Sequence, residues 1–133
     1  MLRTAYNAVS AAIYRAVEQA AGAGLRPAHG NALEMLALQD GLRLTDIAAQ
    51  AGMTTQSMGE IVDDLVAKGY LRRQEDPADR RAKRIYLTGQ GRQAVDAGHL
   101  ATRTAEQLIQ AALGPRQYQQ LRRNLAAIAH LDL

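Results

Sequence analysis

The chain contains no cysteine, so it can form neither a disulfide nor a zinc–thiolate site, and it has no thiol with which to sense an oxidant. It also has no apolar run long enough to cross a membrane. Its first residues, Met1-Leu2-Arg3, lead into an amphipathic pattern rather than a secretory signal. We therefore expect a cytoplasmic protein with no membrane partner.

The patterns of metal binding and catalysis are missing as well. The three histidines, at positions 29, 99 and 130, lack a second ligand at helical spacing, so we expect no metal and no cofactor. There is no Gly-x-Ser-x-Gly elbow, no glycine-rich strand-to-helix loop and no pair of carboxylates beside a histidine. A length of 133 residues fits one domain and leaves no room for a second, catalytic one. The sequence predicts that the protein is not an enzyme.

Positive charge is concentrated in one short segment. The net charge of +3 says little, but six of the sixteen basic residues lie between Lys68 and Gly91. They are Arg72, Arg73, Arg80, Arg81, Lys83 and Arg84. Such a cluster favours an anionic partner such as a nucleic acid, although a solvated hairpin kept soluble by its charge would look the same by composition alone.

Apolar spacing predicts four helices before this basic segment. A first helix runs to about Ala21, and a second begins at Pro27 and ends near Asp40-Gly41. A short third helix follows with Thr45 as its expected N-cap, and Thr54 or Thr55 caps a fourth that continues to about residue 67. The glycine at position 52 permits a tight bend between the last two, which predicts a helix-turn-helix.

A hairpin and two more helices follow. Residues 70–71 and 85–87 favour strands, and EDPADRRA between them suits a turn. Thr88 is expected to cap a helix that reaches Leu113, where Gly114-Pro115 breaks the pattern before a last helix. The first helix and the last two carry apolar stripes that the small central region cannot cover, so we expect them to form a dimer interface.

These residues resemble the MarR family of bacterial transcription regulators over essentially the full chain. The wing signature of that family is an Asp, any residue, an Arg, five residues, then Leu-Thr, two residues and Gly. Here it stands as Asp79, Arg81, Leu87, Thr88 and Gly91. The family pattern of a helix end, a glycine and a short strand also appears, as LVAKGYLRR over residues 65–73.

The resemblance implies a mainly α-helical fold with a small β-hairpin wing, in a single MarR-like domain over residues 1–133. The winged helix-turn-helix would span residues 28–90, and residues 1–22 and 91–133 would form the helical dimerisation region. It implies a homodimer that binds double-stranded DNA at a pseudo-palindromic operator, most often as a repressor, and that a small aromatic effector can release.

In the wing, Arg81 is our candidate for insertion into the minor groove, because a guanidinium is attracted to the negative potential of a narrow groove. Asp79 would hold the Arg81 guanidinium in place; the alternative is a turn-capping Asp beside a surface Arg. We expect phosphate contacts, or simple solvation, for the other basic side chains. These are Arg72, Arg73, Arg80, Lys83 and Arg84.

The recognition helix departs from the family pattern, because residues 54–67 include no basic residue. Relatives commonly place a Ser or Thr near position 59 and an Arg near position 60 or 64, where this chain has Gly59, Glu60 and Asp64. Glu60 would either accept from a cytosine or, like Asp63, pair with Lys68 or a wing arginine. Gly59 suits a close approach to DNA, or reflects drift. The remaining candidates for DNA contact are Thr54, Thr55, Gln56 and Ser57.

The family also implies an effector cleft between the helical region and the winged region. Its candidate lining residues are Tyr6, Tyr14, Arg26 and His29. Each has an alternative role: Tyr6 belongs to an apolar stripe, Tyr14 lies just off it, and a lone histidine is more often a cap or a surface residue. A second reading of the whole chain is a winged-helix protein-interaction module with weak or no DNA binding, which the acidic recognition helix favours.

Overall fold

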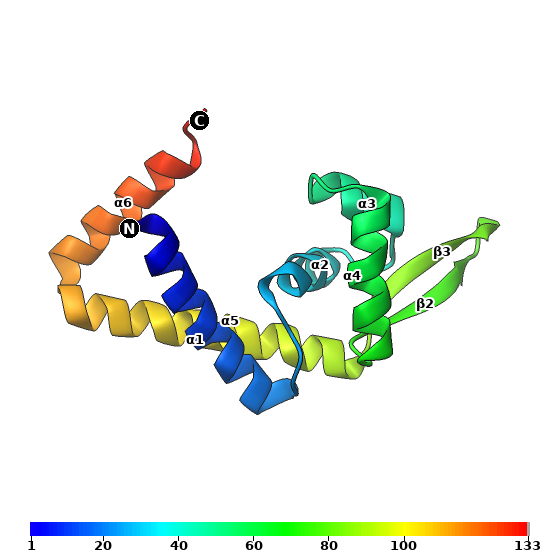
Figure 1. Ribbon diagram of the computed structural model, residues 1–133, viewed down its shortest axis with the longest axis horizontal. Coiled ribbons are helices and arrows are strands. Elements are labelled where there is room, and N and C mark those ends of the chain that lie inside the picture. Colours follow the sequence, from blue (N-terminus) through cyan, green and yellow to red (C-terminus); the bar gives the residue numbers. More distant parts are fainter. Residues whose placement is uncertain (133) are drawn as a thin grey trace.

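The computed structural model describes residues 1–132 as a mainly helical chain with one small sheet (Figure 1). The elements in chain order are α1 (Leu2–Ala21), α2 (Pro27–Leu38), β1 (Leu42–Arg43), α3 (Leu44–Gln50), α4 (Thr55–Ala67), β2 (Leu71–Asp76), β3 (Asp79–Leu87), α5 (Gly89–Leu113) and α6 (Pro115–Ala129). The predicted fold class, a winged helix-turn-helix between terminal helices, is confirmed. Leu133, the last residue of the predicted region 91–133, lies outside the described residues.

The helix-turn-helix forms where the sequence predicts it. Gly52, between α3 and α4, has a φ of 63°, a conformation that side chains other than glycine rarely adopt. Thr54 caps α4, since its hydroxyl accepts a hydrogen bond from the Ser57 backbone amide at 3.1 Å. The expected cap of α3 is wrong. That helix begins at Leu44 with Arg43 as its N-cap and without a side-chain cap, because the chain enters it directly from β1.

The sheet is larger than the predicted hairpin. It has three antiparallel strands in the order β1-β3-β2, with Leu42 opposite Ile85 and Leu71 opposite Leu87. The two-residue strand β1 was not predicted. The segment EDPADRRA is not a turn as a whole, because β2 and β3 extend into it and leave only residues 77–78 between them.

One hydrophobic core joins α2, α3, α4, the sheet and the start of α5. Its largest fully buried side chains include Tyr70, Leu36, Ile47 and Met58. Thr88 caps α5 as predicted, accepting from the Gly91 backbone amide at 3.0 Å. A Cβ at position 91 would lie 2.1 Å from the carbonyl oxygen of Tyr70, so glycine lets α5 start directly against the sheet. The long α5 then runs from the winged region to the helical ends (Figure 1).

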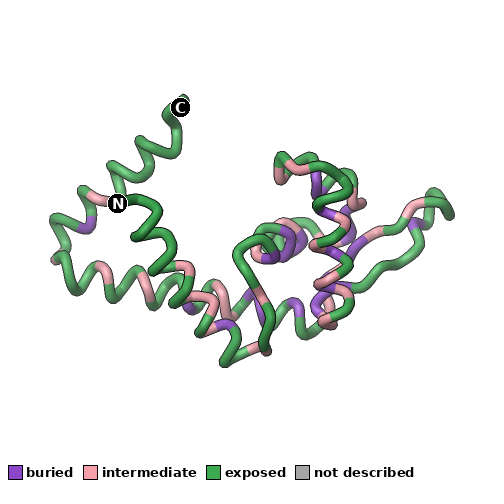
Figure 2. The backbone as a smooth tube through the Cα atoms, viewed as in Figure 1, coloured by how far each residue is buried: buried purple, intermediate pink, exposed green. Residues whose placement is uncertain are grey.

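The helical ends bury few side chains. Helix α1 crosses α5 and packs on it, whereas α6 turns back from the far end of α5 (Figure 1). Only Val17 of α1 and Tyr118 of α6 are buried, and Figure 2 shows both helices as almost wholly exposed. Large apolar side chains are exposed on these three helices, among them Leu2, Tyr6, Leu100, Leu108, Leu125 and Ile128. No helix within residues 1–132 is long and apolar enough to cross a membrane.

Candidate nucleic-acid interface

The N-terminal half of α4 presents small polar side chains to solvent. Thr54, Thr55, Gln56 and Ser57 are all exposed. The Thr54 and Ser57 hydroxyls lie 2.9 Å apart and hold the first turn in a fixed geometry, while Thr55 and Gln56 remain free to contact a partner. Helix N-termini carry unpaired amides and a partial positive charge, which suit a phosphate group. This surface is therefore compatible with DNA despite its lack of basic residues.

The acidic residues of α4 are mostly neutralised within the protein. Asp63 accepts from the wing residue Arg73 at 2.6 Å, as one of the two predictions for it proposed. Asp64 is bonded to Lys68, one turn further along α4. Glu60 is exposed, and no partner for it is found within residues 1–132. Of the three carboxylates of α4, only Glu60 lacks a cationic partner in the described part of the chain.

Gly59 lies in the middle of α4, on the side that faces α3. A Cβ at this position would come no closer than 3.6 Å to its nearest neighbour, the Cδ2 atom of Leu44. That distance is an ordinary van der Waals contact, and Gly59 has no positive φ. The fold therefore does not require glycine here.

The tip of the wing is a bulge that displays two arginines. Lys83 pairs with Glu75 and Asp79 pairs with Asp76, so residues 80–82 of β3 have no partner on β2. Such bulges re-aim side chains and often lie beside functional surfaces. The side chains of Arg80 and Arg81 are exposed, and neither has a hydrogen-bond or ion-pair partner in the described part of the chain.

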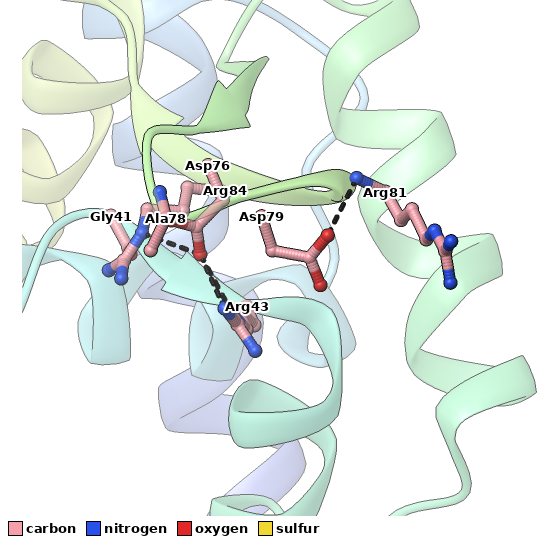
Figure 3. A network of polar contacts seen from close by, with 7 residues as sticks. All are labelled: Gly41, Arg43, Asp76, Ala78, Asp79, Arg81 and Arg84. Carbon is pink, nitrogen blue, oxygen red and sulfur yellow. Dashed lines mark hydrogen bonds and ion pairs between the residues drawn. The ribbon is translucent and has the colours of Figure 1, made fainter.

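The prediction that Asp79 holds the Arg81 guanidinium is wrong, and the alternative, a turn-capping Asp beside a surface Arg, is confirmed. Its Oδ1 atom accepts from the backbone amide of Arg81 at 2.9 Å and not from the guanidinium, which extends away from it in Figure 3. The carboxylate therefore fixes the backbone of the bulge, because its short side chain reaches the amide two residues on. Arg81 is left free at its charged end, which a groove-inserting side chain requires.

A buried carboxylate at the outer end of β2 anchors the wing (Figure 3). Asp76 Oδ2 lies 2.7 Å from Arg43 Nη2 and 3.1 Å from Arg84 Nε, and Oδ1 accepts from the Ala78 amide at 2.9 Å. These bonds hold the pKa of Asp76 at about 2, with the amide of Ala78 as the largest cause and Arg43 next. Arg84 also donates to the Gly41 carbonyl oxygen at 2.9 Å. The cluster ties the wing to β1.

Sequence reasoning missed Asp76 and Arg43. The Asp-Pro pair at 76–77 was interpreted only as a turn signal, and nothing local to Arg43 indicates that it faces the wing. Two other basic side chains of the wing are engaged within the hairpin. Arg72 lies 4.6 Å above the Tyr86 ring and Lys83 is 3.4 Å from Glu75. The guanidinium of Arg43 remains partly exposed beside that of Arg84, so both can still reach a phosphate.

Residues 23–82, which carry the helix-turn-helix and most of the wing, match the MarR family. The resemblance to the MarR family that the sequence predicts is therefore confirmed over this region. A comparison with curated proteins found no match.

Solved structures of regulators share the fold over nearly the whole chain. CouR, a transcriptional repressor solved bound to a 23-mer DNA duplex, is 27% identical, with a TM-score of 0.76, covering 97% of this chain and 89% of that one. A mutant of MepR from S. aureus bound to an oligodeoxyribonucleotide is 25% identical, with a TM-score of 0.70, covering 96% of this chain and 92% of that one. RV1404 from Mycobacterium tuberculosis, at 24% identity, has a TM-score of 0.82 over 98% of this chain and 89% of its own.

These relatives bear on the choice between an enzyme and a regulator. The MarR family and the neighbours whose function is stated are transcription regulators rather than enzymes. The prediction of a transcription regulator and not an enzyme therefore agrees with these relatives.

Two of the four predicted effector residues line a cleft in this MarR fold. The cleft lies between α1, the start of α2 and the middle of α5, and encloses about 260 Å³. Tyr6 and Tyr14 are on its wall, together with Glu34 and Asn31 of α2. Arg26 does not line it and points to solvent at the N-cap of α2. No group of three or more metal-ligating side chains occurs among residues 1–132.

His29 is also outside the cleft wall, buried between α2 and α4. Its Nδ1 atom accepts from the Arg26 backbone amide at 2.9 Å, so the neutral ring carries its proton on Nε2. That atom lies in polar contact with Asp64, 2.7 Å from its Oδ2 atom. Burial lowers the pKa of His29, although Asp64 pulls it the other way. His29 therefore acts as a cap and a link from α2 to the recognition helix.

Proposed function

We propose that this transcription regulator binds a pseudo-palindromic DNA operator as a homodimer, acts as a repressor, and is released by a small aromatic effector. The observation that carries the proposal is the pairing of two free surfaces. The first turns of α4 expose hydroxyl and amide groups, and the bulged wing exposes the unpaired guanidiniums of Arg80 and Arg81.

Each surface has a distinct task on DNA. In a winged helix-turn-helix, α4 enters the major groove, where Gln56 can make two hydrogen bonds to an adenine. The wing follows the backbone, and Arg81 enters the adjacent minor groove, where its charge is attracted by a narrow, A·T-rich segment. Arg80, Arg43 and Arg84 surround it as phosphate contacts. In a dimer, two α4 helices would lie about 34 Å apart, one turn of the duplex.

The ion pairs of α4 favour DNA binding over the alternative function, that of a protein-interaction module. Carboxylates that faced phosphates would weaken binding, but Asp63 and Asp64 are bonded to Arg73 and Lys68. Glu60 alone can face the duplex with its full charge, and a carboxylate in the major groove can accept from a cytosine amine. The acidic character of the helix is thus largely internal.

Dimerisation is supported by the exposed apolar side chains of α1, α5 and α6. An apolar surface spread over three helices is costly in water, and a second copy of the same helices would cover it. The effector role is supported by the cleft between α1, α2 and α5, whose floor includes the first turn of α2. His29, in that same turn, lies 2.7 Å from Asp64 of the recognition helix. A ligand that moved α2 would move α4.

The test is a fluorescence-anisotropy titration against the intergenic DNA upstream of the gene, with a scrambled duplex as control, at several salt concentrations. We expect specific binding at two protomers per site with affinity that falls steeply as salt rises, because phosphate contacts release counterions. Arg81→Ala should weaken operator binding strongly and reduce the salt slope by about 1. Arg123→Ala, on the scaffold helix α6, is the matched control and should leave binding unchanged.

Equal losses of operator affinity in Arg81→Ala and Arg123→Ala would show that the wing is not part of the DNA interface. Weak affinity for every duplex at low salt would instead favour the protein-interaction module.

A further inference from the structure

The cleft between α1, α2 and α5 is lined by one acidic side chain and by no basic one. Of the side chains that line it, Glu34 is the only one charged at neutral pH, and none is Lys or Arg. The other polar groups on its wall are the phenols of Tyr6 and Tyr14 and the side chains of Ser10, Asn31 and Thr102. A carboxylate ligand would find no cation here and would be repelled by Glu34.

Glu34 is available to a ligand. Its carboxylate is half-exposed and lies 3.0 Å from Nε2 of His99 on α5, which is also half-exposed. A neutral histidine donates one hydrogen bond and leaves the negative charge in place. The carboxylate therefore keeps acceptor positions that can face the cleft.

The two tyrosines supply aromatic walls. A Cβ at Gly30 would lie 2.2 Å from the Tyr14 hydroxyl oxygen, so glycine allows this phenol to lie across the first turn of α2. Burial raises the pKa of Tyr14, with Tyr6 and Glu34 as further causes, and this keeps the phenol protonated. Tyr6 also lines the cleft and is 61% exposed.

We propose that the cleft binds a small aromatic cation, an ammonium carried on a single ring, with Glu34 as its counter-ion and Tyr6 and Tyr14 against its faces. The proposal rests on the effector role given to the cleft above. A cation is attracted both by the carboxylate and by the π-faces of the rings, and a volume of about 260 Å³ suits one substituted ring.

The experiment compares three probes of similar size by isothermal titration calorimetry on the full chain without DNA. They are 3-hydroxyphenyltrimethylammonium, its neutral isostere 3-tert-butylphenol, and the anion 3-hydroxybenzoate. We expect the cation to bind about tenfold more tightly than the isostere, since a cation–π contact and an ion pair together contribute on this scale. The anion should bind most weakly.

Variants assign the preference to its residue. Glu34→Gln should bring the cation and the isostere to equal affinity, whereas Glu18→Gln, on α1 and outside the cleft, should keep the full preference. His99→Gln tests whether Glu34 acts only through its bond to α5. It should keep the preference, because the substitution leaves the charge of Glu34 unchanged.

Tighter binding of the anion, equal affinities in the unaltered chain, or no binding of any probe would each overturn the proposal. Because these titrations contain no DNA, they are independent of operator binding. A chain that selects the cation but binds no operator would refute the proposed function alone. An operator-binding chain without selectivity would refute the charge assignment alone.

Discussion

Asp76 shows how much one buried carboxylate can determine in a small wing. It bonds to two arginines and a backbone amide and is almost inaccessible to solvent. Because its pKa is about 2 in the folded protein and 3.8 ordinarily, the unfolded chain binds more protons between these values. Asp76 therefore stabilises the fold fully above pH 3.8, and this contribution is lost as the pH falls toward 2.

We expect Asp76→Asn to lower the unfolding free energy at neutral pH and to flatten its fall between pH 3.8 and about 2. Denaturant unfolding over a pH series measures both effects. Asp96→Asn, an exposed position on α5, is the matched control and should follow the unaltered protein. An acid profile of Asp76→Asn parallel to that of the unaltered chain would exclude this role.

His29 has the opposite relation to acid. Burial lowers its pKa from the ordinary 6.5, so the unfolded state takes up a proton first as the pH falls. Protonation would also turn Nδ1 into a donor and break its bond with the Arg26 amide. The charged groups around the ring are Asp64, Arg26 and Lys68, and the favourable Asp64 is already bonded to Lys68.

The fold should therefore lose stability as the pH falls below 6.5. We expect His29→Asn, which keeps an acceptor near the Nδ1 position, to lose most of this dependence between pH 7.5 and the onset of carboxylate protonation, on the order of pH 5. His130→Asn, at an exposed site beyond α6, should retain it. Thermal melts at closely spaced pH values compare the three proteins, and identical slopes would refute the assignment.

At the scale of elements, α4 contains a helix-destabilising glycine, Gly59, and also presents the surface proposed to contact DNA. Gly59 costs about 0.5–1 kcal/mol relative to alanine in a helix interior, and its surroundings leave room for a Cβ. We expect Gly59→Ala to raise the unfolding free energy by about this amount. If the α4 backbone approaches DNA closely, the same substitution should weaken operator binding. Unchanged affinity with raised stability would place Gly59 outside the interface.

Helices were predictable from sequence because their signals are local. Apolar spacing, the Thr54 and Thr88 caps and the glycine turn at position 52 each act within a few residues, and all four features are present in the structure. The position of the wing in the chain was predicted correctly, but the length of its strands was not. Its strands run through Arg, Asp and Ala residues of low β-propensity, so pairing across the sheet decides their length.

The candidate site was predictable to the same degree. Arg81 and the polar turn of α4 were identified from motifs and are exposed as expected. Strand β1 has two residues and no periodicity of its own, so neither it nor the Arg43–Asp76 contact that spans 33 residues could be inferred. The position of His29 could not be inferred for the same reason, because the nearby Asp64 belongs to another helix. Only the packed structure shows that the ring is buried and does not line the cleft.

At the scale of the whole molecule, the terminal helices are incomplete in a single copy. Helix α6 buries only Tyr118, and α5 and α6 together expose Leu108, Leu125 and Ile128. A helix of 15 residues held by so little apolar contact would be marginal in water, since most helical stability comes from packing of an apolar face. A second copy would supply that packing, as the proposed homodimer requires.

We expect the protein in solution to have twice the 14.4 kDa mass of one chain, measured by sedimentation equilibrium or light scattering. Leu125→Glu should shift it toward the monomer, because a carboxylate buried in the interface without a partner costs several kcal/mol. Leu38→Glu is the matched control: Leu38 is 89% exposed on α2, away from the terminal helices, and its replacement should leave the mass unchanged. Loss of the dimer should also reduce operator affinity, since two half-sites are then no longer bound together. A dimer that survives Leu125→Glu and dissociates in Leu38→Glu would move the interface to the winged region, where it would compete with DNA.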